Sequence, residues 1–141
     1  MRLKKRGAQT LIFDFIRKKW LVLTPEEWVR QHLVNYLVTE KKFIASSISI
    51  EKELILNDLK KRYDVVVYNR NLQPYLIIEC KAPYVALDRP VVEQALRYNL
   101  TVKAELLMIT NGISDLVFNL KNEVVELPIQ NIFRSLNGGH Q

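Results

Sequence analysis

Residues 64–81 read DVVVYNRNLQPYLIIECK, and this stretch decides the predicted fold. Two runs of β-branched, aliphatic and aromatic residues flank a polar loop, which is the pattern of an antiparallel hairpin. If Tyr68 pairs with Tyr75 across the loop, counting back along both strands places Asp64 opposite Glu79. Directly opposed residues share a face of the sheet, with their Cβ atoms roughly 5 Å apart. The sequence therefore predicts two carboxylates that meet at the end of a buried hairpin.

Lys81 is expected beside these carboxylates, because side chains alternate along a strand and Lys81 follows Glu79 by two residues. Two neighbouring carboxylates repel, and a cation between them relieves the repulsion. Magnesium prefers oxygen ligands, which here include the main-chain carbonyl of Cys80. A metal ion that activates water and clamps phosphate oxygens hydrolyses phosphodiesters. The alternative is that these residues are solvated charges at the end of a strand, but three in register favour a site.

Four motifs in the expected order resemble those of a known family. The segments KRYDVVVY at 61–68 and IIECKAP at 77–83 resemble the PD-(D/E)xK nuclease signature, with Tyr63 in place of its proline. More closely, they resemble the N-terminal nuclease domain of the R subunit of type I restriction enzymes. QALRY at 94–98 is similar to the Q-x-x-x-Y motif of RecB-type nucleases, and TNG at 110–112 also fits. The resemblance covers roughly residues 21–120.

The resemblance implies a magnesium-dependent deoxyribonuclease in which manganese can substitute. Asp64 and Glu79 would bind the metal with the Cys80 carbonyl, and Lys81 would position the attacking water. The implied catalytic residues are Asp64, Glu79, Lys81, Gln94 and Tyr98. Related nucleases often add an acid from the N-terminal helix, for which Glu26 or Glu27 is the candidate. Glu27 also stands where a capping box places its glutamate, which favours a structural role over a metal ligand.

The net charge of +6 and the pI near 9.5 suit a polyanionic partner such as DNA. The basic residues expected to meet the phosphate backbone are Arg62, Arg70, Arg97 and Lys103. Other subunits of a restriction system are further implied partners, and a homodimer is open. Two other classes of function stay open as well. One is a DNA-binding or restriction-complex subunit that does not cleave on its own, and the other is a structural domain whose acids form surface ion pairs.

The composition is that of a soluble globular protein, with 48% hydrophobic and 26% charged residues among 141. This length suits a single domain. The one cysteine, Cys80, excludes an internal disulfide and fits a reducing compartment, so we expect a cytoplasmic protein. The apolar stretch at 11–23 is too short and too charged to span a membrane. Cys80 is expected to point into the packed face opposite Glu79, which disfavours a role as nucleophile.

The expected architecture is α/β, a mixed central sheet flanked by helices with a restriction-endonuclease-like core. A basic arm and extension would span residues 1–20, with a frayed first segment 1–6, followed by the core at 21–120. A terminal hairpin strand and helix would complete the single domain at 121–141. Around the central hairpin we expect a helix capped by Thr24, a strand at 43–50, a charged turn at 51–53, a helix from Asp88 to about 102, a strand at 104–110, a hairpin at 116–127 and a helix from Pro128 to 138–139.

Overall fold

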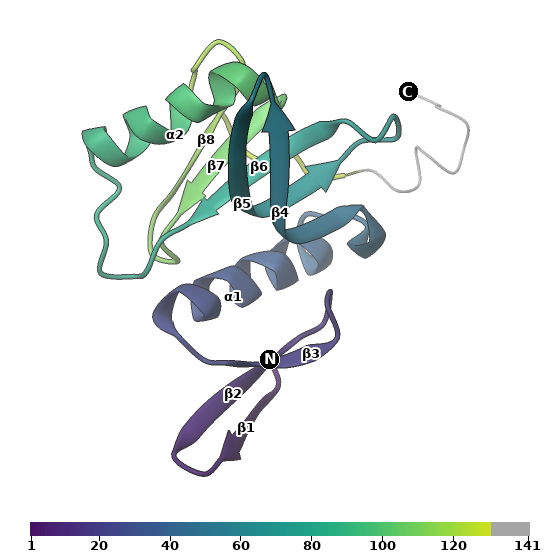
Figure 1. Ribbon diagram of the computed structural model, residues 1–141, viewed down its shortest axis with the longest axis vertical. Helices are drawn as coiled ribbons and strands as arrows, with labels where there is room; N and C mark the ends of the chain where they lie inside the picture. The colour runs from purple at the N-terminus through teal and green to yellow at the C-terminus, as the bar shows by residue number, and fades with distance from the viewer. Residues whose placement is uncertain (131–141) are drawn as a thin grey trace.

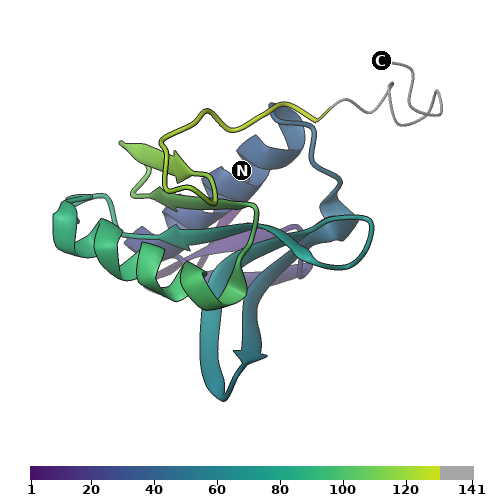
Figure 2. The same ribbon diagram turned by 90° about the horizontal axis from the view of Figure 1, so that it is seen from above.

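The computed structural model describes residues 1–130 and has a mixed five-stranded sheet between two helices (Figure 1). The predicted mixed α/β architecture is therefore confirmed. The sheet order is β4-β5-β6-β7-β8, and Figure 2 shows one helix on each face. The strands are β4 (Ile48–Leu56), β5 (Leu59–Tyr68), β6 (Pro74–Cys80), β7 (Leu106–Thr110) and β8 (Asp115–Phe118). All neighbouring strands are antiparallel except β6 and β7, which run parallel.

Strand β6 lies in the middle of the sheet and is buried on both faces. Leu76 and Ile78 pack in the cluster on the side of helix α1 (Pro25–Thr39). Ile77 packs in the cluster on the side of helix α2 (Arg89–Val102), and all three side chains have 0% exposure. This double burial explains the unbroken apolar run in the sequence, which is typical of strands covered by helices on both sides.

Helix α1 begins where the sequence predicts. The hydroxyl oxygen of Thr24 accepts a hydrogen bond from the main-chain nitrogen of Glu27 at 3.0 Å, and Pro25 occupies the first turn. One stripe of this helix packs on the sheet. Its buried apolar residues are Val29, Leu33, Val34 and Leu37.

Helix α2 forms the crossover between the parallel strands β6 and β7. The Asp88 carboxylate caps it by accepting from the nitrogen of Val91 at 3.2 Å, as the sequence predicts. The helix ends at Lys103, whose φ of 55° lies in the left-handed region. The side chain of Asn99 exchanges two hydrogen bonds with the backbone of Ala104, which fixes the entry into β7.

The expected frayed N-terminal segment is wrong, because residues 3–22 form a three-stranded antiparallel sheet. Its strands are β1 (Leu3–Arg6), β2 (Gln9–Asp14) and β3 (Lys19–Val22). This sheet lies on the far side of α1 from the five-stranded sheet (Figure 1). Phe13 and Trp20 pair across its strands, and Lys4 lies 4.3 Å from the Trp20 ring centroid. Lys4 thus stacks on an aromatic ring while its side chain stays exposed to water.

The β4–β5 hairpin also differs from the prediction. A 3₁₀ turn (Ala45–Ser47) comes first, so the strand begins at Ile48 rather than at residue 43. It then continues through the acidic stretch 51–53, which was expected to be a turn. The turn falls instead at Asn57 and Asp58, which both have positive φ. The outer half of this hairpin protrudes beyond the sheet (Figure 2). Its residues therefore lack the alternation of buried and exposed side chains by which a strand is recognised in a sequence.

The chain after β7 follows the prediction in part. Strand β8 is present, but the second strand of the predicted terminal hairpin is reduced to one bridge between Phe118 and Val124. Residues 128–130 are not helical, and the rest of the predicted last helix lies outside the described residues. No helix within residues 1–130 is long and apolar enough to cross a membrane.

Gly112 in the β7–β8 turn provides a test of this packing. Its φ is +85°, and an added Cβ would meet Cγ2 of Val29 in α1 at 3.2 Å. Gly7 has a φ of +62° but nothing within 4 Å of such a Cβ. We expect Gly7→Ala to lower the free energy of unfolding by about 1 kcal/mol, the cost of a left-handed backbone. Gly112→Ala should cost more in urea unfolding, and equal losses would show that the turn does not press on α1.

Candidate active site

The central hairpin has the predicted register along most of its length. The pairs Val65 with Ile78, Val66 with Ile77 and Val67 with Leu76 are those expected. Continuing this register places residue 64 opposite residue 79. The pairing shifts only next to the loop, where a bulge pairs Tyr68 with Pro74 instead of Tyr75. The bulge lies at the opposite end of the hairpin from the two acids.

A small pocket of about 140 Å³ gathers four of the five implied catalytic residues. Glu79 and Lys81 enter it from the end of β6, and Gln94 and Tyr98 enter from one face of α2. The spacing of four residues on a helix explains why the last two share a face. The lining residues are Lys61, Glu79, Lys81, Val91, Gln94, Ala95, Tyr98 and Ile109. The E-x-K and Q-x-x-x-Y motifs therefore meet in space.

The environment of the Glu79 carboxyl disfavours its ionised form. Burial raises the pKa of its carboxyl, and the nearby Asp64 charge raises it further. Lys61 and Lys81 act in the opposite direction, but the pKa stays above its ordinary value. A carboxylate destabilised in this way gains from any additional cation in the pocket.

Lys61 is a member of this pocket that the sequence prediction missed. Its Nζ lies 3.0 Å from Oε1 of Glu79, 4.9 Å from the ring centroid of Tyr63 and 4.8 Å from that of Tyr98. With Asp64 on the face of Glu79, as the sequence predicted, strict alternation along β5 would have placed Lys61 on the opposite face of the sheet. The signal that could have found it is the lysine two residues before a buried tyrosine, since both side chains then face α2.

Asp64 does not line the pocket of Glu79, although it lies close to it. Its Oδ2 accepts a hydrogen bond from the main-chain nitrogen of Cys80 at 2.8 Å, and its Oδ1 lies 3.6 Å from Arg30 of α1. The side chain thus contacts the α1 side, while Glu79 faces α2, so the expected position of both carboxylates on one face of the sheet is wrong. Opposite Asp64, Glu51 of β4 has a φ of 52°, which marks a local break in the strand geometry.

A network of ions on the α1 side surrounds Asp64. Both carboxylate oxygens of Glu27 accept from the Arg30 guanidinium, and Arg30 also reaches Glu51 at 3.2 Å. Although burial opposes it, the Glu27 charge holds the pKa of Arg30 above its usual range. Arg17 joins Glu51 at 3.0 Å and Asp14 at 2.7 Å. Glu27, the expected extra metal ligand, is therefore committed to a buried ion pair as well as to the helix cap.

The chemistry of the donors near the pocket fits a hard divalent ion. Two carboxylates and a main-chain carbonyl offer oxygen atoms, the ligands that magnesium prefers. Burial, more than the Asp64 charge, raises the pKa of Glu79, and an added cation would offset this. Within residues 1–130, no three His, Cys, Asp or Glu side chains come together as a metal cage. The Cys80 thiol does not compete as a ligand, since it is buried in the α1-side core as predicted.

The four basic residues expected at DNA are all exposed but do not form one patch. Arg62 lies on β5 between Lys61 and Tyr63, and Arg97 lies on α2 next to the pocket residue Tyr98. Lys103 caps the end of α2, and Arg70 lies in the loop at the other end of the β5–β6 hairpin. Arg97 is thus adjacent in sequence to the candidate site, whereas Arg70 is remote from it.

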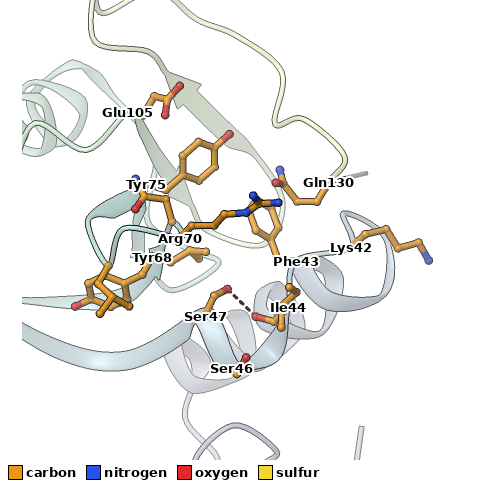
Figure 3. A pocket seen from close by; sticks show the side chains of 13 residues that line it. Lys42, Phe43, Ile44, Ser46, Ser47, Tyr68, Arg70, Tyr75, Glu105 and Gln130 are labelled. Atoms are coloured by element: carbon orange, nitrogen blue, oxygen red, sulfur yellow. Dashed lines mark hydrogen bonds between the residues drawn. The ribbon is translucent and has the colours of Figure 1, made fainter. Parts of the chain in front are cut away.

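A second, larger groove of about 720 Å³ lies at that remote end (Figure 3). Lys42, Arg70 and Tyr75 are among the residues that line it. Burial and the Glu105 charge raise the pKa of Tyr75. None of the implied catalytic residues lines this groove, so its size does not make it the candidate active site.

A comparison with family models shows the family of this chain. Residues 25–132 match the family described as "Type I restriction enzyme R protein N terminus (HSDR_N)", and the chain belongs to this family. A solved structure from Anabaena variabilis, described as a "putative nuclease belonging to DUF820", is similar over 76% of this chain and 71% of that one. It has 12% sequence identity and a TM-score of 0.49. No curated protein matches the chain.

Arg30 allows the ion network to be tested. Arg30→Met removes both charge-assisted hydrogen bonds from arginine to buried Glu27, which then keeps Gln31 and the more distant Arg17. It should lower the free energy of unfolding by about 3 kcal/mol, because the buried charge loses its closest cation. The control is Arg89→Met, which breaks the exposed Arg89–Glu93 pair and should cost less than about 1 kcal/mol. Urea unfolding measures both. Similar small losses would show that Glu27 does not depend on Arg30.

Glu79 and Glu51 should respond to neutralisation in opposite ways. Burial raises the pKa of Glu51, but Arg30 and Arg17 outweigh it, so the net pKa is lowered. Its contribution is then present above the unfolded pKa and disappears as pH falls through the folded pKa. Glu79 has a raised pKa, so its ionised form weakens the fold at neutral pH. We expect Glu79→Gln to raise the melting temperature at about pH 7 and Glu51→Gln to lower it.

Thermal unfolding in a chelating buffer, from about pH 4 to about pH 8, measures these effects. The advantage of Glu79→Gln should shrink on acidification, as wild-type Glu79 takes up a proton. A lower melting temperature for Glu79→Gln throughout this range would contradict the assigned environment of Glu79.

Proposed function

We propose that this chain is a metal-dependent nuclease domain that hydrolyses phosphodiester bonds in DNA. The observation that carries the proposal is the meeting of Glu79 and Lys81 with Gln94 and Tyr98 in one pocket. These residues come from two motifs that are separated in sequence. Residues that were merely solvated on the surface would not be expected to converge on one pocket. Membership of the restriction-subunit family supports the same activity.

Asp64, Glu79 and the main-chain carbonyl of Cys80 would hold the magnesium ion. When bound, the ion would supply Lewis-acid activation of water and neutralise charge on the phosphate. The hydrogen bond from the Cys80 nitrogen to Asp64 links strands β5 and β6 at the site. It would hold the candidate ligands near one another before the ion binds. Manganese, which takes the same oxygen ligands, should substitute.

Lys81 would orient the attacking water or neutralise the charge that develops on the scissile phosphate. Its position is fixed by the backbone, because its main-chain nitrogen donates to the carbonyl of Thr110 at 2.8 Å. The following Asn111 accepts from the nitrogens of Ile113 and Ser114, and its amide donates to Val85. The T-N-G motif therefore holds the turn that supports Lys81. Gln94 would bond a water or phosphate, and Tyr98 would support the site from α2.

A second candidate function is a restriction-complex subunit that needs its substrate or a partner before it cleaves. The observation that favours it is the pairing of both candidate metal ligands with internal cations, Glu79 with Lys61 and Asp64 with Arg30. Such a site would become competent only when those pairs rearrange. DNA and other restriction subunits are the partners that the family membership suggests, and Arg97 is the basic residue adjacent to the pocket residue Tyr98.

Cleavage of supercoiled plasmid tests the proposal directly. With magnesium or manganese the wild-type chain should cut, and Lys81→Ala should cut at least about 100-fold more slowly, because a residue that handles the attacking water is lost. Lys60→Ala should keep wild-type activity, since Lys60 forms only an exposed pair with Glu53.

The possible outcomes separate the two candidate functions. No cutting by the wild type, together with a higher melting temperature in the metal, would favour the subunit that waits for a partner. No cutting and no response to metal would contradict the nuclease. Equal cutting by Lys81→Ala would remove Lys81 from the mechanism.

A further inference from the structure

Glu79 already has a close cation in the described structure, and it is not the lysine of the E-x-K motif. Lys61 forms the ion pair with Glu79 at 3.0 Å, and the two side chains are 21% and 14% exposed. Lys81 lines the same pocket without entering that pair. The nearest counter-charge of the candidate metal ligand is therefore a residue of the neighbouring strand.

We propose that Lys61 is an internal counter-cation that competes with the divalent metal ion for the carboxylate of Glu79. This inference rests on the proposed function. A carboxylate oxygen that accepts from an ammonium group is less available to a metal ion, and the ammonium charge repels the ion as well. Lys61 thus lowers the affinity of the metal-binding residues for metal as long as it stays on Glu79.

Two aromatic rings offer the Lys61 ammonium group an alternative contact when it leaves Glu79. Its ammonium group already lies within 5 Å of the ring centroids of Tyr63 and Tyr98. Aromatic faces attract cations, most strongly where water is excluded. The lysine can therefore give up the carboxylate and remain in the pocket, so its charge stays next to the position of the substrate.

Arg30, the cation near Asp64, has a different role. It binds Glu27 through two nitrogens and also pairs with Glu51, and its side chain is only 10% exposed. Its distance to Asp64 is longer, at 3.6 Å. Arg30 is therefore held independently of Asp64, whereas Lys61 has Glu79 as its anionic partner. Of the two cations, Lys61 is the one that a metal ion displaces.

The same arrangement links metal binding to DNA binding. A phosphate entering the pocket offers the Lys61 ammonium a second anion, which frees Glu79 for the metal ion. Two ligands that each favour the same rearrangement must strengthen one another, by reciprocal linkage. Substrate would then promote loading of the metal site.

The test is manganese titration of the DNA-free protein by calorimetry at about pH 8. Lys61→Met should bind manganese at least about tenfold more tightly than wild type, the equivalent of one charge-assisted hydrogen bond. Lys61→Arg keeps the charge and should return the affinity to near the wild-type value. Lys60→Met removes the adjacent exposed lysine, 65% exposed, and should leave the affinity unchanged.

Each outcome decides the matter. Equal or weaker manganese binding by Lys61→Met overturns the competition but leaves the proposed nuclease standing. No manganese binding by either the wild type or Lys61→Met overturns both. Where Lys61→Met does not fold, lysine side-chain NMR of the wild type during magnesium titration replaces it. The Lys61 signal should shift and the Lys60 signal should not, and an unmoved Lys61 signal overturns the inference.

Discussion

The burial of β6 on both faces is the constraint on which the rest of the structure depends. A strand between two helices gains stability from every apolar residue it carries, but it ends in Glu79 and Lys81, which are costly to desolvate. The fold meets this cost with cations from its neighbours. Lys61 reaches Glu79 on the α2 side, and Arg30 reaches Asp64 on the α1 side. The two acids of the site are therefore each paired with a cation, one on each face of the sheet.

These counter-charges connect stability with function. Burial makes the ionised form of Glu79 less favourable in the fold than in water. The α1-side network is different in kind, because Glu27, Glu51 and Arg30 satisfy one another. The α1-side network is thus a closed set of ion pairs. On the α2 side, Glu79 is the carboxylate for which we propose an exchange of cations.

The sequence predicted those parts of the fold that depend on local patterns. The caps at Thr24 and Asp88, the hairpin register and the meeting of Glu79 with Gln94 and Tyr98 all follow from short-range periodicity or motif spacing. Interactions between distant segments were missed. The pairing of Lys61 with Glu79 depends on the local geometry of β5 near Glu51, and the N-terminal sheet depends on cation–aromatic contacts across strands. Neither has a periodic signature in a single sequence.

The N-terminal sheet has a consequence for where this protein can be divided. The family match begins at residue 25, after the third strand. Yet Asp14 is fully buried, accepts from Gln31 of α1 and holds Arg17, which in turn neutralises Glu51. A fragment cut at the family boundary would lose Asp14 and Arg17, so that Arg30 alone would remain of the two arginines that pair with Glu51. The homologous region and the complete ion network are therefore different stretches of chain, and the longer one includes the N-terminal sheet.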